Sequence, residues 1–243
     1  MSIERIPGGT GIGAEPGAPG GSAATTVDRT SPSMRLQILS TEHWSLLATR
    51  SLAWNESFSR GGMFLSTLSG AMVALALVAQ ASPGGSEFGL FALVILPVVL
   101  FIGVATFVRL GASNYYDAIC VVGMNRIRAA YLELAPDLAP YFVMSANDDG
   151  RGIAISMGVP PGRNSFVHLI AATPAVIGTL DAVLAGAIAS IAGLQIGLGD
   201  GGSLALGIAV FVAAAAVLSR YAQATIARAR ASIRPMFPSP DGS

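Results

Sequence analysis

Residues 88–108 read FGLFALVILPVVLFIGVATFV, a run without a single charged side chain. Three further apolar stretches cover residues 63–81, 166–199 and 203–219, and each is nearly free of charge. At about 1.5 Å per residue, a helix of about 20 apolar residues crosses the hydrocarbon core of a bilayer. The chain is therefore predicted to be an all-α integral membrane protein with four transmembrane helices, the third at about 172–198.

Composition supports a membrane protein and excludes several soluble classes. The mean hydropathy is +0.62, and 12% of the 243 residues are charged, against about 25% in soluble domains. The net charge is zero, so no basic surface is predicted that would neutralise nucleic-acid phosphates. A single cysteine, Cys120, excludes an internal disulfide and a cysteine-based zinc cluster. All 14 basic residues are Arg, and the lack of Lys beside abundant Ala and Gly is typical of a bacterial genome.

The positions of the arginines predict the orientation of the helices. Arginines lie before the first apolar stretch, between the second and the third, and after the fourth. The two short loops, 82–87 and 200–202, contain only Glu87 and Asp200 as charged residues. Basic residues favour the cytoplasmic face of a membrane. Both termini and the central region are therefore predicted to be cytoplasmic, in a multi-pass protein of the bacterial inner membrane.

The order of the segments predicts two helical hairpins of different length. Residues 1–33 are rich in Gly and Pro and are expected to form a disordered tail. Residues 34–135 are expected to form the first hairpin, whose helices continue beyond the membrane as a paired cytoplasmic stalk. Residues 136–165 then form a connector, residues 166–234 a second hairpin that ends in a basic helix, and residues 235–243 a tail.

Both helices of the predicted stalk carry apolar side chains at helical spacing. Steps of three and four residues place such side chains on one face of a helix. In the first helix, the row comprises Leu36, Leu39, His43, Leu47, Trp54 and Phe58. In the second helix, it comprises Cys120, Met124, Ile127, Tyr131 and Leu134. The second row is close to a heptad pattern and predicts a coiled-coil-like seam.

Asp181 is the single acidic residue within the apolar stretches and is a candidate intramembrane polar site. A carboxylate in a transmembrane helix usually faces the bundle interior or a water-filled cavity. In a functional role, Asp181 would bind a cation, relay a proton or line a pore. Two structural roles stay open beside these: a position at interfacial depth, and a protonated packing residue.

Small residues recur at every fourth position in two of the apolar segments. Small faces let helix backbones approach each other closely in lipid. The candidate helix-packing residues are Gly62, Ser66, Gly70, Gly178, Ala182, Gly186 and Ser190. We predict helix–helix contacts at these faces, either within one chain or between subunits.

Two further groups are candidates for interactions outside the apolar stretches. The first group lies on the predicted stalk and comprises His43, Trp44, Trp54, Glu56 and Tyr131. For this group a buried seam is favoured over a ligand pocket. The second group lies on the last helix and comprises Arg220, Arg228, Arg230 and Arg234. These arginines are expected to face anionic lipid at the cytoplasmic surface.

The remaining polar residues predict no catalytic or metal site. Asp148 and Asp149 lack the spaced oxygens of a calcium loop and are expected in a solvated turn. Residues 153–159 are expected either to form a short strand or to rest against the stalk. His43 and His168 have no carboxylates at metal-binding spacing. No nucleophile elbow, HExxH or Walker motif occurs, so we predict no enzyme activity and no cofactor.

Two classes of function remain open on these grounds. In the slightly favoured class, the chain is a scaffold or accessory membrane subunit that interacts through its cytoplasmic stalk. In the alternative, it is a homo-oligomeric channel or pore with Asp181 in a polar path. The predicted partners are the lipid bilayer and either further copies of the chain or another membrane or cytoplasmic protein. A transporter would need several polar side chains within its spans, and these are scarce here.

Overall fold

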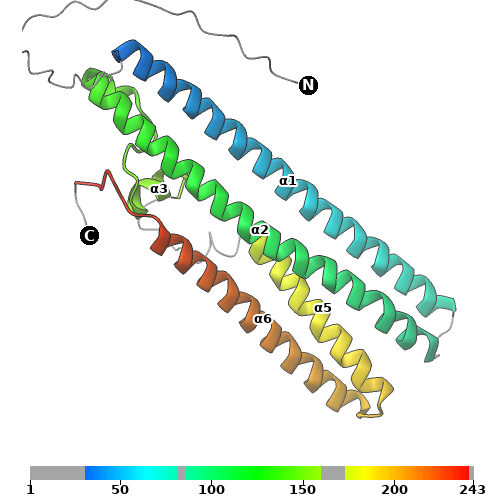
Figure 1. Ribbon diagram of the computed structural model, residues 1–243. Coiled ribbons are helices and arrows are strands. Elements are labelled where there is room, and N and C mark those ends of the chain that lie inside the picture. The colour runs from blue at the N-terminus through cyan, green and yellow to red at the C-terminus, as the bar shows by residue number, and fades with distance from the viewer. Residues whose placement is uncertain (1–30, 82–85, 160–172, 241–243) are drawn as a thin grey trace, which may run out of the picture.

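The protein is described by a computed structural model that covers residues 31–81, 86–159 and 173–240. The predictions for residues 1–30 and for the beginning of the third apolar stretch lie outside the described residues. The elements are α1 (Pro32–Ala81), α2 (Ser86–Leu134), the 3-10 helix η1 (Pro136–Tyr141), α3 (Gly150–Ser156), α5 (Thr173–Gln195) and α6 (Gly199–Ser232), as Figure 1 shows.

Four of these helices are long and apolar enough to cross a membrane, namely α1, α2, α5 and α6. The predicted class of an all-helical protein with four membrane-spanning segments is confirmed to this extent, and the described residues include no strand. In α1 and α2 the apolar stretch is one part of a longer, unbroken helix. The 50 residues of α1 extend over about 75 Å, more than twice the thickness of a hydrocarbon core.

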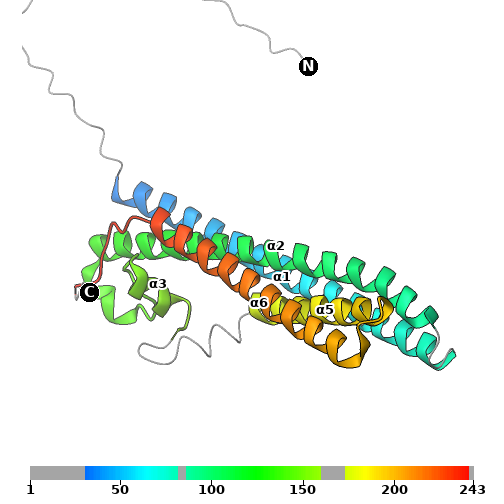
Figure 2. The same cartoon turned by 90° about the horizontal axis from the view of Figure 1, so that it is seen from below.

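The four long helices lie side by side, with α2 at the centre of the packing. Figures 1 and 2 show α1 along one side of α2, and α5 beside the half of α2 that carries its apolar stretch. α6 packs chiefly on α5 and continues beyond it. The apolar core is formed by Phe64, Ala71, Leu75, Ala92, Leu96, Val99, Phe107, Leu110, Ile177 and Leu184.

Glycine residues allow the chain to turn sharply between α5 and α6, and they allow these two helices to pack closely. At the turn, Gly197 and Gly199 have φ angles of 82° and 66°, in the left-handed region that L residues rarely adopt. Further along, a Cβ on Gly186 would lie 2.8 Å from the carbonyl oxygen of Gly207, and a Cβ on Gly207 would lie 2.9 Å from that of Gly186. The two backbones are therefore in direct contact, and a larger side chain would force them apart.

Three helices continue beyond their apolar stretches in one direction, away from the end of the bundle where α1 ends, α2 begins and α5 is followed by α6 (Figure 1). We call these parts the stalk segments: residues 32–62 of α1, 109–134 of α2 and 220–232 of α6. They contain arginine, aspartate and glutamate, whereas the apolar parts of the same three helices contain none.

The connector after α2 contains two short helices. η1 follows α2 directly, and α3 includes residues 153–156, for which a strand was one of the two expectations. Asp149 caps α3, and its carboxylate accepts a hydrogen bond from the N–H of Gly152 at 2.8 Å. The helix cap explains why this segment forms a helical turn.

Candidate functional site

Asp181 lies inside the helix bundle of a single chain. It is 1% exposed, and neither of its carboxylate oxygens has a hydrogen-bond partner among the described residues. A Cβ built on Gly103 of α2 would overlap Asp181 Oδ1 and would lie 2.7 Å from the ring of Phe64 of α1. The carboxylate therefore projects from α5 into the place where α1 and α2 meet.

Gly103 makes room for this carboxylate, because any L side chain at that position would collide with it. Thr106, one turn further along α2, donates its hydroxyl hydrogen to the carbonyl oxygen of Ile102 at 2.8 Å, so this hydroxyl does not donate a hydrogen bond to Asp181. The space around Asp181 thus fits its shape but offers no counter-charge. The sequence did not single out Gly103, because it is one of 29 glycines and no motif marks it.

Asp181 lies nearer to the stalk segments than to the opposite end of the bundle. Its neighbours Phe64 and Gly103 are four and six residues from Arg60 and Arg109, the arginines that border the first two apolar stretches. These separations correspond to about 6 and 9 Å along a helix axis. The carboxylate therefore lies within the apolar part of the bundle, about one to two turns from its boundary.

The small residues predicted on α5 do form helix contacts within the chain. Ala182 is fully buried, and a Cβ on Gly178 would lie 3.0 Å from the ring of Phe107. Gly186 meets the backbone of α6, and Ser190 lies against the same helix. This face is therefore used for close packing against α2 and α6.

The small residues predicted on α1 have different surroundings. Gly62, Ser66 and Gly70 are exposed, and nothing lies within 4 Å of a Cβ on either glycine. This face of α1 takes no part in the packing of the described chain. Contact between subunits through it stays a prediction.

The apolar row predicted on the stalk segment of α1 does not face α2 from Leu47 onward. Leu47, Trp54 and Phe58 are 38%, 50% and 65% exposed. The less exposed positions instead form a row with steps of three and four residues: His43, Leu46, Arg50, Ala53, Ser57, Gly61, Phe64, Leu68, Ala71 and Leu75. The second predicted row, on α2, is buried as expected at Cys120, Met124 and Ile127.

The reason for the shifted face is that polar side chains of α1 have partners on α2. The Nε of Arg50 donates to Asp117 at 2.6 Å, and this ion pair is partly buried. The hydroxyl of Ser57 donates to that of Ser113 at 2.8 Å. Helical periodicity predicts that apolar side chains face the interior. It contains no information on Asp117, the carboxylate 67 residues away in the chain that pairs with Arg50.

The predicted stalk cluster is divided between two faces of α1. His43 stacks on Tyr131 of α2, with ring centroids 6.1 Å apart and an interplanar angle of 14°. Burial, and secondarily the positive charge of Arg128, lowers the pKa of His43, so the neutral imidazole is the form that packs here. Trp44 and Trp54 are 69% and 50% exposed and do not join this pair.

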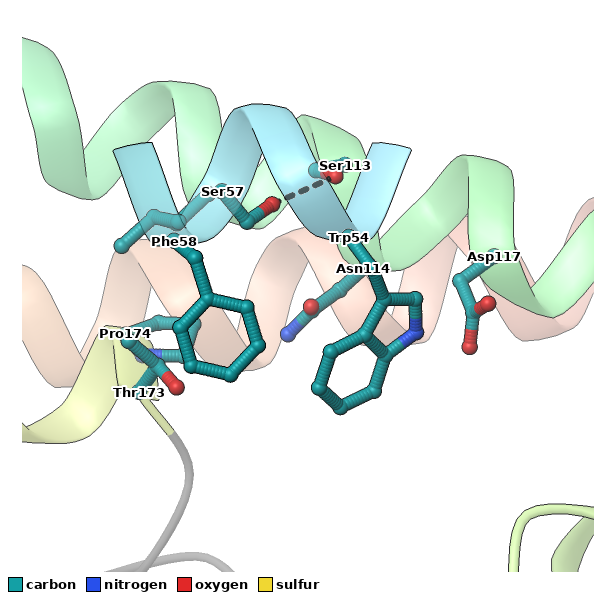
Figure 3. A pocket seen from close by; sticks show the side chains of 9 residues that line it. Trp54, Ser57, Phe58, Ser113, Asn114, Asp117, Thr173 and Pro174 are labelled. Carbon is teal, nitrogen blue, oxygen red and sulfur yellow. Dashed lines mark hydrogen bonds between the residues drawn. The ribbon is translucent and has the colours of Figure 1, made fainter. Parts of the chain in front are cut away.

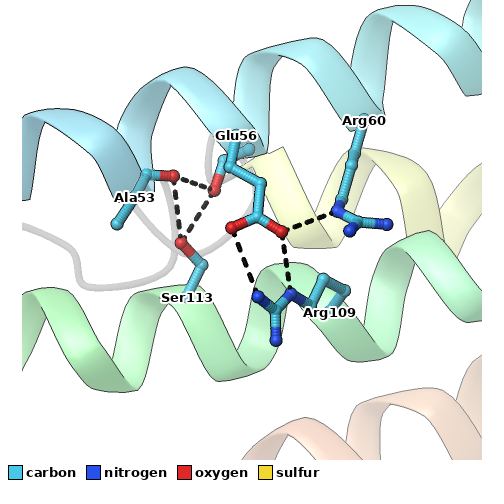
Figure 4. Close-up of polar contacts among 6 residues, drawn as sticks. Ala53, Glu56, Arg60, Arg109 and Ser113 are labelled. Atoms are coloured by element: carbon cyan, nitrogen blue, oxygen red, sulfur yellow. Dashed lines mark hydrogen bonds and ion pairs between the residues drawn. The ribbon is translucent and has the colours of Figure 1, made fainter. Parts of the chain in front are cut away.

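Glu56, also a predicted stalk residue, links α1 to α2 through Arg109 and pairs with Arg60 of its own helix (Figure 4). It accepts hydrogen bonds from the Nε atoms of Arg60 at 2.9 Å and of Arg109 at 3.0 Å. The hydrogen bonds from Arg109 and Arg60 lower the pKa of Glu56. Because these two arginines border the first two apolar stretches, the network marks the boundary between the apolar bundle and the stalk segments.

A groove of about 240 Å³ opens between α1, α2 and the first residues of α5 (Figure 3). The rings of Trp54 and Phe58, with centroids 5.7 Å apart, form an apolar wall. The polar lining comes from Ser57, Ser113, Asn114, Asp117 and Thr173. The groove therefore combines an aromatic side with hydrogen-bonding groups, next to the stalk-side end of the apolar bundle.

The connector binds the C-terminal segment, residues 233–240, through Asp148. This residue is fully buried, which contradicts its expected place in a solvated turn. Its carboxylate accepts hydrogen bonds from the backbone N–H groups of Met236 at 2.9 Å and Phe237 at 2.7 Å, and from Arg126 Nε at 2.7 Å. Burial alone would raise the pKa of Asp148, but the hydrogen bonds from these three donors outweigh it and lower the pKa.

Neighbouring polar side chains complete this attachment. Asn125, which is fully buried on α2, donates to the carbonyl oxygen of Asn147 at 2.7 Å and accepts from the hydroxyl of Ser156 at 2.8 Å. Asp149 accepts from the N–H of Ser239 at 2.9 Å. The part of the predicted tail that the structure describes, residues 235–240, is therefore bound to the connector.

The arginines of α6 lie at different distances from the apolar stretch of that helix. Arg220 follows the stretch directly, whereas Arg230 is about 15 Å further along the helix. Arg234, which was predicted on the last helix, lies beyond the end of α6 at Ser232, and its carbonyl oxygen accepts a hydrogen bond from Arg126 of α2 at 2.9 Å. Contact of Arg220, Arg228, Arg230 and Arg234 with lipid stays a prediction, and Arg220 has the most suitable position.

No group of three or more His, Cys, Asp and Glu that could hold a metal ion occurs among the described residues. Comparisons with protein-family models, curated proteins and solved structures gave no match to this chain.

Proposed function

We propose that the protein is a non-catalytic scaffold or accessory subunit of the bacterial inner membrane, with its stalk segments in the cytoplasm. The distribution of arginine supports this orientation. The ion pairs Arg50–Asp117, Glu56–Arg109 and Arg126–Asp148 all involve stalk segments. Charged groups are costly to place in hydrocarbon, so their position supports stalk segments that stand in water.

The observation that carries the proposal is the exposure of large apolar side chains on the stalk segment of α1. Trp44, Trp54 and Phe58 are 69%, 50% and 65% exposed. Apolar surface in water costs about 25 cal/mol per Å². Exposed apolar side chains gathered on one element of a soluble region are typical of protein interaction sites. We therefore assign the docking surface to this segment.

The spacing and charge of the stalk segments favour an acidic, amphipathic helix of another protein as the partner. Leu47, Trp54 and Phe58 follow one another at steps of seven and four residues, so they lie along one side of α1. A helix laid along such a side contacts its apolar residues turn by turn. The stalk segments contain nine arginines and four acidic residues, a formal charge of +5. A second copy would carry the same positive charge, whereas an acidic partner would be attracted.

Site-specific photo-crosslinking in intact membranes tests this role. A photoreactive residue replaces Trp54 in the full-length chain, and Thr49, which is exposed on another side of α1, is the matched control position. We expect one discrete adduct with an acidic protein from position 54, none from position 49, and loss of the adduct with Phe58→Glu. The adduct must form again from the two purified proteins. An adduct with the mass of two copies, or none from position 54, would contradict the proposal.

The pore alternative finds less support in the geometry. A path along the axis of an oligomer would need Asp181 on a surface that several copies share. Asp181 is 1% exposed and lies between helices of its own chain. The position of this residue therefore favours a different role.

A further inference from the structure

Asp181 is a buried acidic group that a scaffold role leaves unexplained. Both of its carboxylate oxygens lie without a donor or counter-charge among the described residues. Transfer of an ionised carboxylate into such surroundings is strongly disfavoured, whereas the neutral acid is tolerated. We propose that Asp181 is a proton-binding site, and that its proton exchanges with the stalk side of the membrane through the groove beside Trp54 and Phe58.

A proton fits this place better than a metal cation does. Calcium and magnesium take six or more oxygen ligands, and the smaller number supplied by one carboxylate leaves most of the shell empty. Gly103 has no side chain and Phe64 presents a hydrocarbon ring, so neither side chain at the carboxylate provides a ligand oxygen. The nearby hydroxyl of Thr106 already bonds to its own helix. A neutral acid needs no such shell.

The residues that line the groove and the residues at the Asp181 carboxylate lie along the same sides of α1, α2 and α5. On each helix, one residue lining the groove lies seven positions from a residue at the carboxylate. Seven residues are two helical turns, about 10.5 Å, and return to nearly the same face. The three pairs are Ser57 and Phe64 on α1, Leu110 and Gly103 on α2, and Pro174 and Asp181 on α5. The groove and the carboxylate therefore share one interhelical space.

On α2, Leu110 lines the groove and Phe107 lies between it and Gly103 at the carboxylate, and both side chains are apolar. Leu110 and Phe107 are 1% and 5% exposed. Phe107 lies against Gly178 of α5, and its ring centroid is 6.1 Å from that of Tyr221 of α6. Water reaches Asp181 only when these side chains move, so we expect proton exchange to be slow and to depend on the packing at Leu110.

No charged group among the described residues contacts the carboxylate from the helices packed around it. On α1 and α2 the nearest charges in sequence are Arg60 and Arg109, and both are held by Glu56. On α6, Tyr221 packs against Phe107, and Arg220 is beside it in sequence. Loss of the proton would therefore place an uncompensated charge in the bundle and loosen α5 from α2.

Reaction with a hydrophobic carbodiimide tests the proposal, because this reagent labels the protonated form of a buried acid. The acid proton passes to a carbodiimide nitrogen while the carboxylate oxygen adds to the central carbon. The product rearranges to a stable acylurea, which adds the mass of one reagent molecule. The full-length protein is reconstituted in vesicles with separately buffered sides, and labelling of Asp181 is followed by mass spectrometry.

We expect labelling of Asp181 to fall by roughly tenfold or more when the pH on the stalk side is raised from about 6 to about 9. The same change on the opposite side should leave labelling unchanged. Asp181→Asn should abolish the label, whereas Asp200→Asn, which removes an exposed carboxylate near the other end of the bundle, should keep it. Leu110→Ala retains the acid and should make labelling respond faster to the stalk-side pH.

Three outcomes would overturn the proposal. The first is a lack of labelling at Asp181 at low pH in the folded protein. The second is labelling that follows the pH on the side opposite the stalk segments. The third is labelling that responds to neither side, because a proton that never leaves makes Asp181 a packing residue only. The scaffold role is tested separately by the crosslinking from position 54, even though Trp54 and Phe58 also line the groove.

Discussion

Replacement of Asp148 by Ala is expected to release the C-terminal segment from the connector. Three donors would lose their acceptor: the N–H groups of Met236 and Phe237 and the Nε of Arg126, at 2.9, 2.7 and 2.7 Å. Hydrogen bonds to a charged group contribute about 1.5–3 kcal/mol each. The Arg126 side chain is 34% exposed and can form hydrogen bonds with water instead, so the loss of its bond to Asp148 contributes least to the weakening. The attachment should weaken by about 3–5 kcal/mol.

Hydrogen exchange measured by mass spectrometry is the suitable assay, because the loss is local. Amide exchange in a peptide covering residues 233–240 should become roughly 10² to 5 × 10³ times faster in Asp148→Ala. Exchange in the apolar parts of α5 and α6 should not change, since those helices pack on each other away from the connector. Asp137→Ala removes an exposed carboxylate of η1 and serves as the matched control.

The pH dependence of the same attachment has a definite sign. The pKa of Asp148 is lowered in the folded chain relative to its ordinary value of 3.8. The contribution of Asp148 to the attachment of residues 233–240 is therefore fully present above about pH 3.8. It is lost as the pH falls through the lower pKa that Asp148 has in the folded chain. If the exchange of Met236 and Phe237 in Asp148→Ala equalled that of the wild type near neutral pH, the assignment of Asp148 as the anchor would be refuted.

Three further predictions concern the helix contacts. Gly186→Val should lower the free energy of unfolding by about 1–3 kcal/mol, measured by thermal unfolding, because the larger side chain pushes α5 away from α6. Gly201→Ala is the control and should cause no such loss, because nothing lies within 4 Å of a Cβ at that position. The pKa of His43 is lowered from 6.5 in the folded chain, so its contribution to the free energy of unfolding should be lost as the pH falls below 6.5. The melting temperature of His43→Phe should not show this pH dependence. A double-mutant cycle of Arg50→Ala and Asp117→Ala should give a coupling of about 1 kcal/mol, and zero coupling would contradict the ion pair.

The candidate site was predictable only in its individual residues. Asp181 stood out because a carboxylate is rare in an apolar segment, and the structure places it in the bundle interior. Gly103 and the groove could not be anticipated, since both depend on how α1, α2 and α5 pack. Trp54 was expected in a buried seam, because aromatic residues are usually buried, yet the pairing of Arg50 with Asp117 turns it outward.

The sequence by itself determined the number of apolar segments, their helical form and the side on which the charges gather. These features follow from local quantities: the cost of burying charge and the length of helix that crosses a bilayer. Only the tertiary structure decided which face of α1 meets α2, and that Asp148 binds a segment about 90 residues further along the chain. Such pairings depend on distances between residues far apart in sequence, which neither periodicity nor composition contains.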